Sequence, residues 1–313
     1  VLATFPLLPP EDHPNSEVED MKTRQNGLTL LALLLTLSLS VLLAGCGSDD
    51  PASPLDTTAT VNEDAAQAVA SDVASDSGGV SDQLADLSMA IGGLGGEKSV
   101  PDGEFVHGRF RTSEYDEITG TWTVTVAREQ GFPEGTPYHA MSRVFTLRLL
   151  NAAGQPQQYR VVGADTAVTA EFNIVSGTGI HRTQRRTHNL DELSGEFLVT
   201  GVNSDMLTIN GTYLRGATNA IETPRFSRTL VSVLDVELSD VTVPRIMGTN
   251  FNDAVSGTIT GTWVADITVT RGDDYSEQHV EREITIVLGD GEAEINCGGR
   301  AFRALLGTGE MRR

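Results

Sequence analysis

The stretch Thr119-Gly120-Thr121-Trp122-Thr123-Val124-Thr125-Val126-Ala127 alternates between two kinds of side chain. Trp122, Val124 and Val126 fall on one side of the stretch, and threonines fall on the other. This period of two is typical of a β-strand with one buried and one solvated face. The same alternation returns at 145–149 and 168–174, so the chain after residue 102 is predicted to form an antiparallel sheet.

A short motif recurs in this part of the chain. Ile118-Thr119-Gly120-Thr121-Trp122 returns as Ile259-Thr260-Gly261-Thr262-Trp263 and, more loosely, as Ile209-Asn210-Gly211-Thr212-Tyr213. We therefore expect an internal repeat, with copies at 118–163 and 259–300. In each copy the isoleucine, the glycine and the ring share one parity, which places the glycine on the packed face and lets the strand bend there. Trp122, Tyr213 and Trp263 are predicted to be core residues, and the alternative is that they line an interior cavity.

Turn signals separate the alternating segments at short intervals. They lie at 151–154, 191–195, 203–205, 273–274 and 289–291. Such spacing favours about a dozen strands that are mostly linked as hairpins. The predicted fold class for 103–313 is all-β, with one large antiparallel curved sheet or open barrel of about a dozen strands.

Residues 46–102 have a different composition, rich in Ser, Asp, Ala and Gly and without an aromatic residue. We expect an acidic flexible spacer that contains two short helices, at 65–75 and 80–91. Val80, Leu84, Leu87 and Ile91 fall on one helical face, and Asp76-Ser77-Gly78-Gly79 separates the two segments. The prediction is a short N-terminal helical hairpin whose apolar stripe packs on the sheet; the alternative is that this acidic pair stays disordered.

A targeting pattern lies further towards the N-terminus. Met21 is followed by Lys22 and Arg24, and residues 27–43 are uncharged and rich in leucine, which is typical of a secretory signal. The apolar run is slightly shorter than the ~20 residues that a spanning helix needs. Residues 1–20 are acidic and contain several prolines, a composition that no signal peptide needs. We expect them to be a spurious extension, with translation beginning at Met21.

The end of the apolar run, Leu43-Ala44-Gly45-Cys46, resembles the lipobox of bacterial lipoprotein precursors. The resemblance covers only 21–46. It implies that the signal peptide 21–45 is removed, that the Cys46 sulfur receives a diacylglyceryl group and that the new amine is acylated. Two or more acyl chains hold a protein stably at a membrane, whereas one does so only marginally. The alternative is an uncleaved membrane helix that ends in cysteine.

The resemblance also implies a place in the cell. A lipoprotein of this kind is held in the bacterial cell envelope, and the membrane is its partner through the lipid on Cys46. Gly47, rather than aspartate, follows the cysteine. In lipoproteins of enteric type this implies release towards the outer membrane.

Charge and cysteine content narrow the function further. Lys and Arg number 22 against 43 Asp and Glu, a formal net charge of −21, which disfavours nucleic acid and anionic lipid as partners. Lipidation of Cys46 leaves Cys297 as the remaining thiol, so the body is predicted to lack an intrachain disulfide. Cys297 shares the parity of Ala293 and Ile295, which predicts a buried structural thiol.

Motifs that would carry catalysis are missing from the sequence. It contains no Gly-x-Ser-x-Gly elbow, phosphate loop or dinucleotide fingerprint, and none of the 6 histidines pairs at a metal-ligand spacing. We therefore expect no enzyme, no metal and no cofactor. His181 and His188 flank an arginine-rich stretch that either binds an anion or is the polar face of a strand.

Two interpretations of function follow. The preferred one is a lipid-anchored, non-enzymatic binding or structural module whose β domain contacts an envelope protein or another envelope component. The alternative is a carrier of a hydrophobic ligand, held in a cavity beneath the curved sheet.

Overall fold

The structure is a computed structural model that describes residues 58–93, 105–106, 109–161, 163, 165–246 and 251–312. All of these belong to one compact unit, Asp56–Arg313. The predicted extension 1–20, the signal peptide 21–45 with Leu43, Ala44 and Gly45, the lipidation residue Cys46 and the first part of the spacer lie outside the described residues. Within the described ranges, no helix combines the length and the apolar character that crossing a membrane requires.

Two helices, α2 (Thr58–Val73) and α3 (Val80–Gly93), confirm the predicted pair of helices. Gly78 in the turn between them has a φ of 68°, a left-handed conformation that glycine adopts without steric cost. The predicted stripe is buried, with exposed fractions of 2% or less for Val80, Leu84, Leu87 and Ile91. The helix pair is therefore ordered rather than disordered, because its apolar stripe is buried against the sheet.

The rest of the described chain is mainly β-sheet. The strands are β1 (Phe105–Val106), β2 (Arg109–Asp116), β3 (Thr121–Gly131), β4 (Tyr138–Asn151), β5 (Pro156–Gln157), β6 (Ala167–Arg182), β7 (Arg186–Thr200), β8 (Met206–Thr223), β9 (Phe226–Pro244), β10 (Ser256–Arg271), β11 (Asp274–Gly289), β12 (Glu292–Cys297), β13 (Arg300–Leu305) and β14 (Met311–Arg312). A single turn of 3-10 helix, η1 (Asn252–Ala254), precedes β10.

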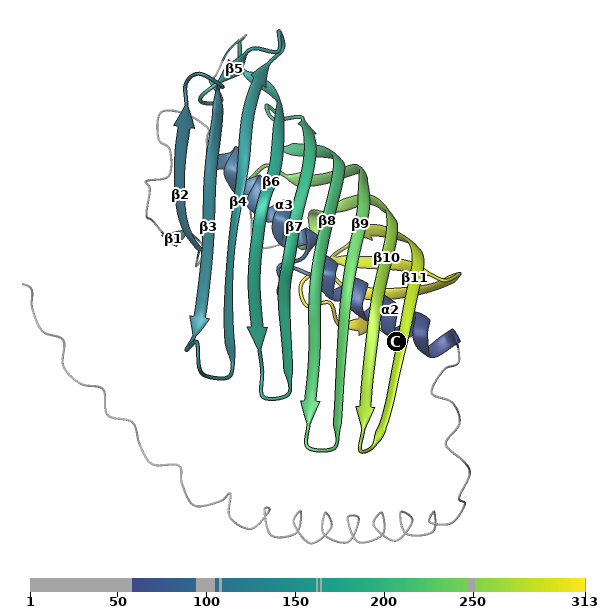
Figure 1. Ribbon diagram of the computed structural model, residues 1–313. Coiled ribbons are helices and arrows are strands. Elements are labelled where there is room, and N and C mark those ends of the chain that lie inside the picture. Colours follow the sequence, from purple (N-terminus) through teal and green to yellow (C-terminus); the bar gives the residue numbers. More distant parts are fainter. Residues whose placement is uncertain are drawn as a thin grey trace, which may run out of the picture. The chain divides into compact units, whose positions relative to one another are not determined.

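The strands form one 14-stranded antiparallel sheet in the order β1-β2-β3-β4-β6-β7-β8-β9-β10-β11-β12-β13-β14, with β5 paired to β4. Neighbours in the sheet are almost all neighbours in sequence, so the connections are hairpins, as predicted. The two ends of this order, β1 and β14, are not paired with each other in the part of the chain that the structure describes, and the sheet is open. Figure 1 shows the long strands β3 to β11 side by side and curving over the two helices. The all-β prediction of a large curved sheet is confirmed.

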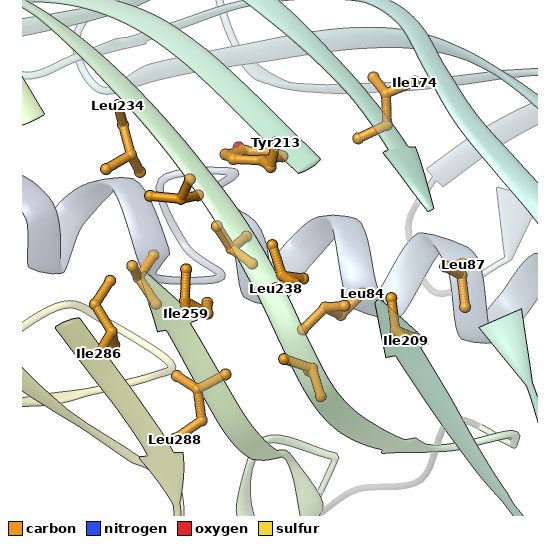
Figure 2. Close-up of a cluster of buried hydrophobic side chains, with 14 of the residues drawn as sticks. Leu84, Leu87, Ile174, Ile209, Tyr213, Leu234, Leu238, Ile259, Ile286 and Leu288 are labelled. Atoms are coloured by element: carbon orange, nitrogen blue, oxygen red, sulfur yellow. The ribbon is translucent and has the colours of Figure 1, made fainter. Parts of the chain in front are cut away.

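The core lies between the helices and the face of the sheet on which they pack, which we call the inner face. Strand β9 shows the alternation clearly: Leu234, Val236 and Leu238 are buried on the inner face, whereas Val233 and Asp235 are exposed on the outer face. Figure 2 shows this layer, with Leu84 and Leu87 of α3 among the side chains of the strands. Cys297 is fully buried, as predicted.

The first copy of the repeated motif departs from the prediction. Ile118 is 96% exposed, and Gly120 lies in a turn with a φ of 69° rather than on the packed face of a strand. Asp116 holds this turn, because its carboxylate accepts hydrogen bonds from the Ile118 amide at 2.8 Å and the Thr119 hydroxyl at 2.9 Å. The strand therefore begins at Thr121, two residues after the start of the alternating stretch.

The other two copies agree with the expected parity. Ile209 and Ile259 are fully buried, and Tyr213 and Trp263 are buried beside them. A Cβ on Gly261 would lie 2.7 Å from the Val236 Cα, closer than real side chains come to a backbone. Glycine is required there because the neighbouring strand β9 approaches so closely.

One predicted turn is a bulge instead. The turn signal at 191–195 lies inside β7, where the pairing with β8 shifts between Leu190 and Glu192. The extra residue, Asp191, lets Leu190 and Leu193 both face the core although they are three residues apart. The polar composition that indicated a turn reflects a bulged strand.

Candidate functional site

Four acidic residues of the helices, and the amide of Asn62, meet arginines of the inner face in the order in which the helices cross the strands. From α2 to α3 the contacts are Asn62 with Arg282 of β11, Asp64 with Arg228 of β9, Asp72 with Arg215 of β8, and Asp82 and Asp86 with Arg143 of β4. Figure 1 shows α2 and α3 following one another across the sheet, which agrees with this order. We call these contacts the ion ladder.

The ion ladder includes charges that are removed from water. Arg143 reaches Asp82 and Asp86 at 2.5 Å each, and Arg215 reaches Asp72 at 3.0 Å, with all five side chains at most 6% exposed. Burial lowers the pKa of Arg143, but the two aspartates outweigh this effect and raise its pKa above the usual value. Burial also raises the pKa of Asp72, against the opposing effect of Arg215. Each pair joins one particular helix position to one particular strand position, and we expect this to specify where the helices dock.

A chain of hydrogen bonds leads from the ladder to the surface. The Arg215 guanidinium donates to Asp72 Oδ1 at 3.0 Å and contacts His188 Nε2 at 2.9 Å. A guanidinium has no acceptor, so His188 Nε2 accepts and its Nδ1–H donates to Asn219 Oδ1 at 2.7 Å. The same amide oxygen accepts from exposed Arg186 at 3.2 Å. This neutral tautomer agrees with the pKa of His188, which burial, aided by Arg215, lowers to about 4.

Three histidines stand in one row across the inner face. His139 of β4 pairs in register with His181 of β6, which pairs in turn with His188 of β7. The rings of His139 and His181 lie 5.7 Å apart, edge to face. Among the described residues, the buried His139 Nε2 has no hydrogen-bond partner. Burial, together with Arg128 and His181, lowers the pKa of His139 to about 4. The β6–β7 hairpin brings His181 and His188 together, because its turn lies in the arginine-rich stretch, and pairing of β4 with β6 adds His139.

We define the cationic strip as the inner-face side chains Arg128, His139, His181, Arg186, His188, Asn219 and Arg228. They come from β3, β4, β6, β7, β8 and β9, near the ends of the hairpins. Figure 1 shows that these hairpin ends extend past the helices. His181 and Arg186 are accordingly exposed, and Arg128 and His139 are half-buried. The helices cover the rest of the inner face but not this part of it, so His181 and Arg186 are accessible to solvent.

A small hollow of about 120 Å³ lies where the strip meets α2. Its lining includes Arg186, Asn219 and Arg228 together with apolar Ile221 and Leu230. Asp64 is also in the lining and takes a hydrogen bond from Arg228 at 2.8 Å. A carboxylate from the protein itself thus already lies against the strip, which indicates the kind of group that this surface accepts.

The strip offers hydrogen-bond donors, and Arg128, Arg186 and Arg228 give it positive charge, because burial lowers the pKa of His139 and His188 to about 4. Arginine side chains only donate, and paired guanidinium groups recognise carboxylates. Within the described residues, no three His, Cys, Asp or Glu side chains form a group that could hold a metal ion. Burial raises the pKa of the Cys297 thiol, which disfavours the reactive thiolate.

The predicted aromatic residues lie away from this strip. Trp122 packs against Tyr115 and Tyr159 and donates its indole N–H to the Gln158 carbonyl at 2.7 Å. Tyr213 and Trp263 are fully enclosed in the core. Of the three, Tyr213 is in the lining of a hollow of about 610 Å³ on the outer face, although its side chain is only 1% exposed and belongs to the core.

Sequence reasoning missed the ion ladder, although a signal was present. Arg143 has the parity of Phe145 and Leu147, and Arg215 has that of Tyr213, so both are placed among buried residues. Asp82 and Asp86 are four apart beside the apolar stripe of α3. Arginines at inward parity and acids on the buried side of a helix together indicate buried ion pairs. The pairing of particular residues required the tertiary structure.

Comparison with known proteins adds no relative. No protein-family model matches the chain, and no curated protein or solved structure matches it.

Proposed function

We propose that this chain is a lipid-anchored, non-enzymatic binding module of the bacterial cell envelope that holds an acidic segment of a partner on the cationic strip. The observation that carries the proposal is the ion ladder. On the same face of the same sheet, inward arginines already bind the carboxylates of α2 and α3. The strip adds the guanidinium groups of Arg128 and Arg186 beyond the helices, where no described segment covers Arg186.

The net charge of −21 would repel an acidic partner at long range. At physiological ionic strength, however, charges are screened over about 8 Å, so the groups within reach decide binding. Side chains of α2 and α3 fill the inner face that a hydrophobic ligand would otherwise occupy, and this favours a binding module over a carrier.

A double variant that removes two positive charges tests the strip. The protein is the soluble form that begins at Gly47, which contains the whole unit Asp56–Arg313, and the probe is a fluorescent oligoglutamate peptide. Arg128→Gln/Arg186→Gln is expected to weaken binding about tenfold or more, because both cations face the strip. The matched control is Arg148→Gln/Arg303→Gln, which removes the same charge from the outer face. No binding to the unaltered protein at low salt, or equal weakening by both double variants, would contradict the proposal.

The anchor is tested separately, with the native precursor in a bacterial host. Cys46→Ser is expected to abolish incorporation of radioactive fatty acid and to move the protein from the membrane fraction to the soluble fraction, because the thioether needs the sulfur. Persistent labelling of the variant would refute the lipobox assignment. It would leave the proposal for the strip intact.

A further inference from the structure

The outer face of the sheet carries two hollows on neighbouring strands. One, of about 920 Å³, is lined by β3, β4, β6 and β7, and the other, of about 610 Å³, is lined by β4, β6, β7, β8 and β9. Both are open to solvent, and they follow one another along β6 and β7. We call the two hollows together the trough.

Bulges in β6 and β7 lie within the trough. Pairing of β4 with β6 shifts so that Val175 is an extra residue, and pairing of β7 with β8 shifts so that Asp191 is an extra residue. Bulges bend a strand and increase its twist, which hollows the surface of a sheet locally. Val175 is consequently 57% exposed, a large fraction for a valine in the interior of a sheet.

The charges of the trough are mostly negative. Glu129 and Asp191 line the first hollow, and Glu196 and Asp235 line the second. Arg128 also lines the first hollow, but its parity is that of buried Val126, so its side chain belongs to the inner face. Ser142, Thr178 and Thr212 add hydroxyl groups between the acids. The outward side chains thus present acceptors and negative charge.

The dimensions suit an extended chain. On β6 the second hollow is lined by 173–175 and the first by 178–180, and the span from Asn173 to Ile180 at about 3.3 Å per residue is roughly 23 Å. A segment of about seven extended residues spans this length. Carboxylates on both sides of such a path would pair with alternate cationic side chains, and exposed Val175 and half-buried Ile180 would cover the stems of those side chains.

We propose that the trough binds an extended basic segment of a partner protein, one that carries lysine or arginine side chains. This site lies on the face opposite the cationic strip, and it does not depend on the proposed function. It requires no reaction and no cofactor. Charge complementarity and the hollowed shape together select this class of occupant, because a flat acidic face alone would attract cations without orienting a chain.

A peptide titration tests the proposal with the soluble form that begins at Gly47. The probe is a fluorescent peptide of alternating lysine and serine, about seven residues long, and a glutamate–serine peptide is its negative control. Glu129→Gln/Glu196→Gln/Asp235→Asn is expected to weaken binding of the lysine peptide about tenfold or more. Asp191 is left unchanged because it accepts a hydrogen bond from Thr218 at 2.6 Å.

The matched control variant is Glu277→Gln/Glu281→Gln/Glu283→Gln, which removes the same charge from exposed outer-face positions of β11. It is expected to change binding by less than about twofold, since these residues lie outside the trough. Amide chemical-shift changes on adding the peptide should concentrate in β4, β6 and β7. Equal weakening by both triple variants, shifts centred on β11, or no binding at low salt would each overturn the proposal.

Discussion

Removal of Arg143 tests whether buried charge pairs fix the helices on the sheet. Arg143→Met keeps most of the side-chain volume but leaves Asp82 and Asp86 buried without the guanidinium that both contact at 2.5 Å. Deleting one partner of a buried ion pair typically costs about 3–5 kcal/mol, because the remaining charge stays away from water. For a protein of this size, that corresponds to a fall in melting temperature of roughly 6–20 °C.

The measurement is urea unfolding of the soluble form that begins at Gly47, followed by circular dichroism. Arg148→Met is the matched control: its partner Glu171 lies 3.4 Å away on the outer face, and the two side chains are 37% and 47% exposed. Exposed pairs contribute about 0–1 kcal/mol, so this control should change the free energy of unfolding little.

Two further measurements separate charge from packing. Adding Asp82→Asn and Asp86→Asn to Arg143→Met should recover part of the loss, because no uncompensated charge then remains. The deficit of Arg143→Met should also shrink as the pH falls below about 5. Carboxylates that are buried without their cation have raised pKa values, so they favour the folded state when protonated. The reasoning fails if Arg143→Met costs no more than Arg148→Met, or if the triple variant is less stable than Arg143→Met.

Three other predictions concern stability and reactivity. Folding lowers the pKa of His188 from 6.5 to about 4, so the contribution of neutral His188 to the free energy of unfolding is full above pH 6.5 and is lost as the pH falls towards 4. The unaltered protein should therefore lose on the order of 2–3 kcal/mol between these pH values, and His188→Gln should not show this loss. Unfolding curves with the same pH dependence in both proteins would refute this. Gly261→Ala should cost about 2 kcal/mol or more, since its Cβ would lie 2.7 Å from the Val236 Cα, whereas Gly289→Ala, with nothing within 4 Å, should cost less than about 0.5 kcal/mol in the same urea assay. Cys297 should react with a maleimide only on unfolding, because it is fully buried and burial raises the pKa of its thiol; rapid labelling of the folded protein would contradict this.

Much of the fold was predictable because it depends on local patterns. Alternation at 145–149 and 168–174 identified β4 and β6, since each side chain either faces the core or faces water. The stripe from Val80 to Ile91 identified the buried face of α3 for the same reason. The wrong predictions lie where the same short polar sequence is compatible with two local backbone structures. Asp191 indicated a turn and forms a bulge, and Gly120 indicated a strand and forms a turn.

The sequence by itself determined the strands, the helices, the acidic charge and the targeting pattern that predicts lipidation at Cys46, because each depends on neighbours in the chain. Only the tertiary structure decided which residues meet. Register between strands brought His139, His181 and His188 into one row, and helix docking set Asp72 against Arg215. Asp72 and Arg215 are 143 positions apart, and no local pattern specifies such a pair. Folding joins them because buried charges require partners, wherever in the chain those partners lie.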